Sequence, residues 1–277
     1  MTETTSEIFE KYQVRKTKKQ RAAFAEYVES LAADYGYSFM TEKGSFGSKN
    51  LVVGDPSKAK VVYTAHYDTA PVLPFPNFIT PKNIFLYLLY NFALVAVFFF
   101  ISFVIGVTVG VISAFANIDV YIASIVSELV FLILLVMLVA GPANKHTAND
   151  NTSGVTLLID IMRDLPEERR GDVAFVFFDL EEVGLIGSSA FAARYKAEMK
   201  DRLLLNFDCV SDGENMLFAL KKRAKPYRDA IEKAFAAKDG FKVEVCDKGV
   251  FYTRIRQDFP WVSVLPLCAP QEADSFI

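Results

Sequence analysis

Two long stretches of the sequence carry almost no charge, and they limit the folds that the chain can adopt. No residue is charged over 83–118, and the stretch 120–140 carries only Glu128. A helix needs about 20 apolar residues to cross a bilayer, so each stretch is long enough to span one. The two stretches therefore predict a transmembrane hairpin over residues 83–140, with the lipid bilayer as its partner.

The segments on either side of this hairpin are expected to form one soluble domain. Residues 1–82 and 141–277 can share a domain only if the chain crosses the membrane an even number of times, and two crossings satisfy this condition. The first 20 residues contain no apolar core, so they do not resemble a secretory signal. We therefore predict one discontinuous α/β domain, interrupted by the hairpin.

The charges around the hairpin predict its orientation. Basic residues stand before the apolar stretches, at 15–21 and at Lys82, and after them, at Lys145. The short connection between the two stretches contains neither Lys nor Arg. Positive charge is retained on the cytoplasmic side of membranes. The predicted location is a cell membrane crossed twice, with the soluble domain and both termini in the cytoplasm. The basic cluster at 15–21 is interpreted as a solvated helix face rather than a lipid-binding site.

Overall charge and cysteine content exclude some functions. The net charge of the 277-residue chain is −3, which argues against a nucleic-acid-binding surface. The three cysteines, Cys209, Cys246 and Cys268, fit neither a disulfide framework nor a paired-cysteine metal site, which favours a reducing compartment.

Helical and strand patterns alternate through the soluble segments. Apolar residues recur at helical spacing over 20–36 and again just after Asp150, and a third helix is expected over 187–199. Short apolar runs predict strands at 51–53, 61–65, 172–179 and 203–208. This order predicts an α/β fold, a mostly parallel sheet flanked by helices, with chemistry at the carboxyl ends of the strands.

Acids and a histidine accumulate at those strand ends and at one helix start. The residues are His66, Asp68, Asp150, Glu181, Glu182 and Asp208. Imidazole and carboxylate groups are the usual ligands of catalytic zinc, and clustered acids repel one another without a cation. Taken singly, each signal is weak, because an Asp before a helix is usually a cap and paired acids are usually solvated. Their joint occurrence predicts a metal site.

The segments that carry these residues resemble a known family. Four segments are similar to motifs of the zinc-dependent aminopeptidases, the family that includes bacterial leucyl aminopeptidases and glutamate carboxypeptidases. The segments are AHYD, ANDNTSG, DLEEVGLIGS and NFD. The resemblance extends from about residue 50 to residue 215. It implies a zinc-peptidase-like fold, two zinc ions in a co-catalytic pair, and peptide substrates.

The resemblance also implies a role for each candidate residue. It assigns four residues to the metal ions: His66 and Asp208 to the first zinc, Asp150 to both ions as a bridge, and Glu182 to the second. Glu181 would be the general base that takes a proton from the attacking water, and Asp68 would hold the far nitrogen of His66. Asp179 is expected to face away from the metal.

The chain departs from the family near its end. The family supplies a further histidine ligand for the second zinc there, and no histidine follows His146 in this sequence. One choice of codons for residues 253–267, read in another frame, encodes PDQAGLSMGVGVAAL, which resembles the family's pattern. We therefore interpret the C-terminal end as truncated or frameshifted, with an incomplete second zinc site. His146 is expected to hydrogen-bond rather than to bind metal.

The leading prediction is a membrane-anchored zinc metallopeptidase, an aminopeptidase that hydrolyses short peptides. The residues do not distinguish an aminopeptidase from a carboxypeptidase, because pocket residues lie on loops without a signature. Two alternatives stay open: a catalytically impaired binding or scaffold protein, and an acyl-transfer enzyme of the glutaminyl-cyclase kind that uses one zinc. The role of Glu128 also stays open.

Overall fold

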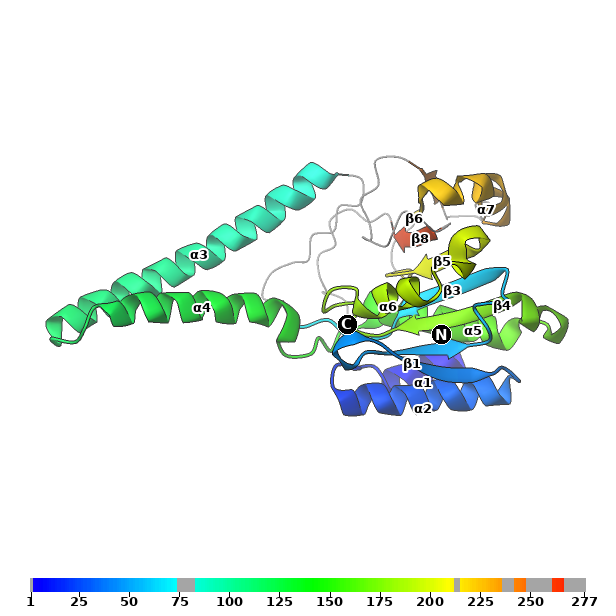
Figure 1. Cartoon of the computed structure of the whole chain (residues 1–277), viewed down its shortest axis with the longest axis horizontal. Helices are drawn as coiled ribbons and strands as arrows, with labels where there is room; N and C mark the ends of the chain where they lie inside the picture. The colour runs from blue at the N-terminus through cyan, green and yellow to red at the C-terminus, as the bar shows by residue number, and fades with distance from the viewer. Residues whose placement is uncertain (1, 74–82, 212–214, 236–241, 248–260, 267–277) are drawn as a thin grey trace. The chain divides into compact units, whose positions relative to one another are not determined.

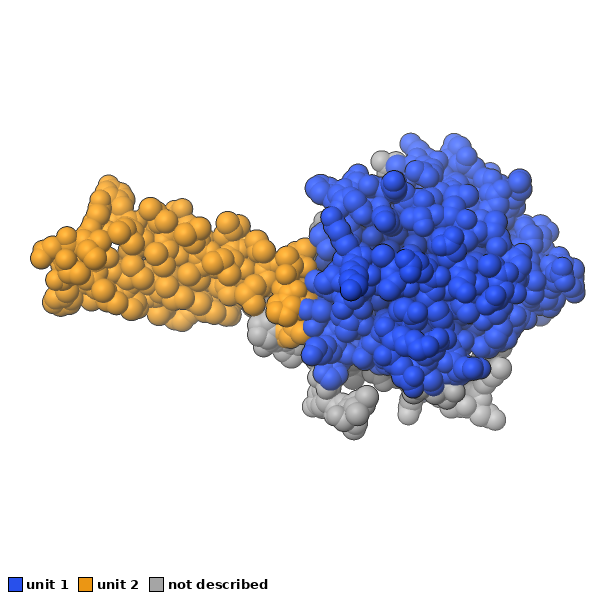
Figure 2. All heavy atoms as spheres, turned by 90° about the horizontal axis from the view of Figure 1, so that it is seen from below, with its two compact units in different colours: residues 1–70, 143–269 blue, residues 71–142, 270–277 orange. Residues whose placement is uncertain are grey.

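The computed structural model describes residues 2–73, 83–211, 215–235, 242–247 and 261–266. The chain divides into two compact units, which Figure 2 colours separately. Unit 1 combines Met1–Ala70 with Ala143–Ala269, and unit 2 contains Pro71–Pro142. Lys82, Cys268 and most of the segment with the unexpected C-terminal pattern lie outside the described residues.

Unit 1 is built on a mixed eight-stranded sheet in the order β1-β2-β4-β3-β5-β8-β6-β7 (Figure 1). Its strands are β1 (Phe39–Lys43), β2 (Lys49–Val53), β3 (Val61–His66), β4 (Val173–Phe178), β5 (Leu203–Phe207), β6 (Asn215–Leu220), β7 (Lys242–Cys246) and β8 (Trp261–Pro266).

The prediction of a mostly parallel sheet is wrong. The pairs β3–β4, β3–β5, β5–β8 and β6–β7 are parallel, whereas β1–β2, β2–β4 and β6–β8 are antiparallel. The connection from β1 to β2 covers only residues 44–48, and so short a connection joins antiparallel neighbours. The parallel part, β4-β3-β5-β8, is the middle of the sheet.

Helices cover this sheet on both faces. They are α1 (Glu3–Lys11), α2 (Lys18–Asp34), α5 (Gly154–Asp164), α6 (Ile186–Arg194) and α7 (Arg228–Ala234). The predicted helix over 20–36 is α2, which begins at a capping box: Thr17 Oγ1 accepts from Gln20 N, and Gln20 Oε1 accepts from Thr17 N. Its buried stripe is Phe24, Val28 and Ala32.

All six residues of β4 are buried, because successive side chains of this strand enter different cores. Phe175 and Phe177 belong to the cluster that includes Phe24 of α2. Val176 and Phe178 belong to the second cluster, with Phe191 of α6. A strand buried on both faces reads as a continuous apolar run, as its sequence VAFVFF does.

Unit 2 consists of α3 (Ile84–Phe115) and α4 (Tyr121–Ala140), which pack antiparallel as a hairpin. Ser127 Oγ donates to Ser102 O at 2.9 Å, and the rings of Phe99 and Phe131 pack edge to face. At the base of the hairpin, Val72 N donates to the carbonyl of Pro142 at 2.7 Å. Both helices are long and apolar enough to cross a membrane.

Candidate metal centre

Three neighbouring parallel strands end at the same edge of the sheet. His66, the last residue of β3, pairs in register with Phe178, the last residue of β4, and Thr64 pairs with Asn206 of β5. Residues that directly follow β4 and β5 are therefore delivered beside His66. The carboxyl ends of parallel strands are where open α/β sheets place their sites.

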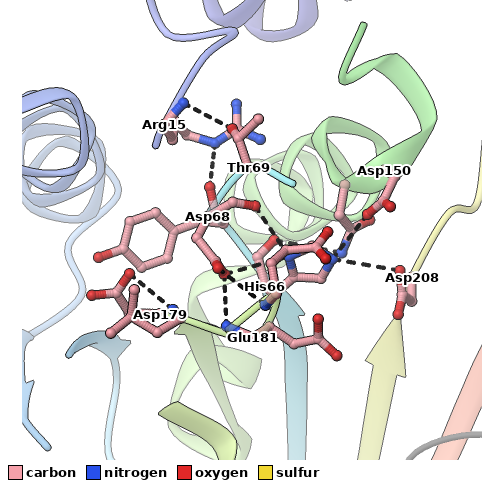
Figure 3. Close-up of polar contacts among 12 residues, drawn as sticks. Arg15, His66, Asp68, Thr69, Asp150, Asp179, Glu181 and Asp208 are labelled. Carbon is pink, nitrogen blue, oxygen red and sulfur yellow. Dashed lines mark hydrogen bonds and ion pairs between the residues drawn. The ribbon is translucent and has the colours of Figure 1, made fainter. Parts of the chain in front are cut away.

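The structure brings all six predicted residues together. His66 Nε2 lies 3.1 Å from Asp150 Oδ1 and 3.6 Å from Asp208 Oδ1. Figure 3 shows the carboxylates of Asp68, Asp150 and Asp208 pointing toward the His66 ring. Among the described residues, two groups offer ligand atoms that all lie within 4.8 Å of one another: His66 with Asp150 and Asp208, and His66 with Glu181 and Glu182.

The electrostatics of this cluster fit a divalent cation. Burial, together with the charges of Asp208, Asp68 and Asp150, raises the pKa of Glu181 to about 8, although His66 acts in the opposite direction. Burial and Asp150 also raise the pKa of Glu182 well above its usual range. A pocket that holds this many acids is therefore short of positive charge. One histidine and several carboxylates are a donor set that suits zinc.

The same surplus of acids raises the pKa of His66. Burial alone would lower the pKa of its imidazole, but hydrogen bonds with Asp150, Asp208 and Asp68 raise that pKa well above the ordinary value. The first donor group, His66 with Asp150 and Asp208, consists of the residues expected at the first zinc. Their role as ligands stays a prediction.

Asp68 has a contact that sequence reasoning missed. His66 Nδ1 lies 3.2 Å from the backbone oxygen of Asp68 and 3.6 Å from its carboxylate. The carboxylate also accepts hydrogen bonds from the backbone amides of Glu181 at 2.9 Å and Glu182 at 3.2 Å. Asp68 therefore links the loop after β3 to the loop after β4, in addition to its contact with the histidine.

Asn151 connects three parts of the site and is not among the candidate residues that the sequence singled out. Its side-chain Nδ2 donates to Phe207 O at 3.0 Å, and its Oδ1 accepts from Gly154 N and Cys209 N. The residue is fully buried. The contact with Gly154 is local in the sequence, whereas the contacts with the end of β5 depend on tertiary structure.

The basic cluster over 15–21 is not a solvated face throughout, which corrects the sequence interpretation. Arg15 is completely buried. Arg21 Nε pairs with Asp179 Oδ1 at 3.0 Å, and Asp179 also accepts from Lys49 N. Asp179 belongs to neither donor group, in agreement with the structural role expected for it.

Two other residues considered in the sequence lie outside the donor groups. His146 is exposed, and its backbone amide donates to Asn144 Oδ1 at 2.9 Å. Glu128 is exposed on α4.

Part of the chain matches a model of a known peptidase family. The sequence profile described as Peptidase family M28 matches residues 135–259, which include Asp150, Glu181, Glu182 and Asp208. The predicted family resemblance is thereby confirmed. A search of curated proteins gave no significant match.

Solved structures of aminopeptidases and glutaminyl cyclases share the fold. The LapA aminopeptidase of Legionella pneumophila is 15% identical, with a TM-score of 0.51 over 95% of this chain and 57% of that chain. A leucine aminopeptidase precursor from Bacteroides thetaiotaomicron is 16% identical, with a TM-score of 0.51 over 95% and 82%. Glutaminyl cyclase of Porphyromonas gingivalis is 14% identical, with a TM-score of 0.55 over 97% and 83%. The chain thus spans little more than half the length of LapA.

Proposed function

We propose that this chain is a membrane-anchored zinc aminopeptidase that hydrolyses short peptides. The observation that carries the proposal is the convergence of His66, Asp150 and Asp208 on one point, with Glu181 and Glu182 beside them. The family match supports a metallopeptidase-like enzyme that uses zinc. His66, Asp150 and Asp208 would hold one ion, and Asp150 with Glu182 would contribute to a second, incomplete site.

Zinc supplies Lewis acidity, which makes a water molecule more acidic and polarises a carbonyl group. Glu181 takes the proton of the attacking water and returns it to the leaving amine. Burial raises the pKa of this carboxyl above its ordinary range, which makes the carboxylate a stronger proton acceptor than an exposed one. Asp68 holds Glu181 in place by accepting its backbone amide, while it also contacts His66.

The hairpin would anchor this enzyme to a cell membrane. Its support is the length and composition of α3 and α4, together with large apolar side chains that face outward, such as Phe92 at 81% and Phe115 at 88% exposure. The bilayer would cover these side chains. The excess of Lys and Arg beside the spans favours a cytoplasmic catalytic unit with both termini on that side.

Cyclisation of glutaminyl peptides is the second candidate. His66 is the histidine of both donor groups among the described residues. Because one histidine cannot serve two ions equally, this arrangement favours an enzyme with a single zinc ion. Glutaminyl cyclases are among the structures that share the fold. Both candidates need a proton acceptor at Glu181, so a Glu181 variant cannot separate them. Product analysis on a glutaminyl peptide can, because hydrolysis releases free glutamine, whereas cyclisation releases ammonia.

The deciding experiment measures zinc stoichiometry by elemental analysis on the detergent-purified chain, together with hydrolysis of a panel of aminoacyl-anilides. We expect at least one tightly held zinc ion per chain and turnover that a chelator abolishes and added zinc restores. A chain without bound zinc and without turnover would contradict the proposal and favour the scaffold alternative.

A further inference from the structure

Arg15 is the largest fully buried side chain of the described residues, and it lies next to the candidate metal centre (Figure 3). A buried charge is costly unless neighbouring groups satisfy it. The guanidinium makes four hydrogen bonds, all to oxygens without formal charge: Tyr67 O at 2.5 Å, Tyr12 O at 2.7 Å, Gln13 O at 3.2 Å and Thr152 Oγ1 at 3.1 Å. Its guanidinium carbon also lies over the ring of Phe24, 5.3 Å from the ring centroid.

The partners of Arg15 lie on two segments that carry candidate zinc ligands. Tyr67 directly follows His66, and the backbone amide of Arg15 donates to Thr69 Oγ1 at 2.8 Å. Thr152 lies two residues after Asp150. One arginine therefore contacts the loop after β3 and the loop before α5 at the same time.

A second contact strengthens this connection. Thr147, which precedes Asp150, donates from Oγ1 to Gln13 O at 2.8 Å and shares a hydrogen bond with the hydroxyl of Thr152. The segment 12–15 thus contacts the loop before α5 at both Thr147 and Thr152. These two ligand-bearing loops are separated in the sequence by the whole of unit 2, so the N-terminal segment supplies a link between them within unit 1.

Charge supports the same link. Burial lowers the pKa of Arg15 to about 10, and the nearby charges of Asp68 and Asp150 act in the opposite direction. The side chain therefore stays protonated at neutral pH. It places one permanent positive charge behind an acid cluster that is short of positive charge.

We propose that Arg15 is a positioning residue for the metal centre: it holds the loop after β3 and the loop before α5 together, so that His66 and Asp150 face the same ion. The proposal rests on the function proposed above, because it requires that these residues bind a metal. Arg15 itself does not touch the ion or the substrate. Residues that orient metal ligands typically contribute about 10–100-fold to metal affinity.

The test is a Co²⁺ titration of the full chain in detergent, which reports affinity through competition with a chelator and ligand geometry through the visible absorption spectrum. Arg15→Met removes the charge and the hydrogen bonds but keeps an unbranched apolar stem. We expect about 10–100-fold weaker Co²⁺ binding and an altered spectrum. Arg15→Lys keeps the charge with a single donor group in place of the fork, and we expect it to recover part of the affinity.

Arg163→Met is the matched control. Arg163 is an exposed arginine of α5 that pairs with Asp160 and Asp164, and we expect Co²⁺ affinity within about twofold of the original chain for this variant. If Arg15→Met fails to fold, Thr152→Val provides the same test, because it deletes the oxygen that accepts from Arg15 Nη2 and keeps the side-chain volume. We expect a weakening of about 3–10-fold there, within the range for a lost hydrogen bond.

Two results would overturn the inference, and they differ in what else they exclude. An original chain that binds no Co²⁺ would contradict the proposed function and this inference with it. An original chain that binds Co²⁺, with unchanged affinity and spectrum in the folded Arg15→Met or Thr152→Val variant, would contradict the inference alone.

Discussion

The two units of the chain place apolar side chains in opposite ways. In unit 1, Phe175 and Phe177 are completely buried, as a water-soluble domain requires. In unit 2, Phe99 is 66% exposed, while Ser102 and Ser113 are buried at 2% and 4%. This distribution fits the proposed membrane hairpin, in which packing between α3 and α4 favours small residues and the bilayer accepts large apolar ones. The two units thus place their large apolar side chains as two different surroundings would require.

The largest expected difference between the two units is the effect of a Glu→Gln substitution on catalysis. Glu181→Gln in unit 1 should lower hydrolysis by about 10²–10⁴-fold, because the amide cannot accept a proton from water. Zinc content should be retained, since His66, Asp150 and Asp208 are unchanged. The matched change in unit 2, Glu128→Gln, should leave turnover unaltered. Kinetics on the substrate found in the anilide panel, with elemental analysis of both variants, would test this prediction. Equal losses of turnover in both variants would contradict the catalytic role of Glu181.

The second difference concerns stability. Phe177→Ala should lower the free energy of unfolding of unit 1 by about 3–5 kcal/mol, because a fully buried ring is lost from the core. Phe99→Ala makes the same chemical change on an exposed site of α3, and we expect an effect below about 1 kcal/mol on that unfolding transition. Urea titration followed by circular dichroism in detergent measures both. A large loss in Phe99→Ala would show that the stability of unit 1 depends on the hairpin.

The third difference between the units is the effect of an introduced arginine on membrane insertion. Leu132 of α4 and Met40 of β1 are similarly exposed, at 55% and 48%. Leu132→Arg should disfavour membrane insertion by about 2.5–3.5 kcal/mol, whereas Met40→Arg should not change it. Alkaline extraction of membranes from expressing cells separates inserted from released chains. Equal retention of both variants would argue against the membrane-anchoring role of unit 2.

The smallest effect concerns packing within the hairpin. A Cβ added at Gly106 would lie 2.9 Å from Ser127 Cβ, so Gly106→Ala should force α3 and α4 apart at a cost of about 1–3 kcal/mol. Gly171 of unit 1 has no atom within 4 Å of an added Cβ, and Gly171→Ala should be tolerated. Disulfide formation between cysteines introduced at Phe99 and Phe131, measured with each variant, reports the helix pairing. Unchanged cross-linking in Gly106→Ala would show that Ser127 moves aside.

Local pattern allowed much of the fold to be predicted. The helical stripe with Phe24 and Val28 is α2, and the apolar run VAFVFF is β4, because burial on one or two faces leaves a periodicity in the sequence. The candidate ligands were found because strand ends and motif spacing are local as well. The antiparallel pair β1–β2 was missed because no strand was predicted over residues 39–43. The pairs β2–β4 and β6–β8 were missed because the pairing of strands distant in sequence has no comparable local signal.

Two features follow from local sequence alone: the two helices that are apolar enough to cross a membrane, and the strands that end in acids and a histidine. Both depend on residues close together in the chain. Two other features exist only in the folded molecule. Asp68 accepts the amides of Glu181 and Glu182, and Arg15, one member of an ordinary basic cluster, is buried against Tyr67 and Thr152. These contacts join segments that are far apart in the sequence, and their geometry exists only after the sheet has brought the segments together.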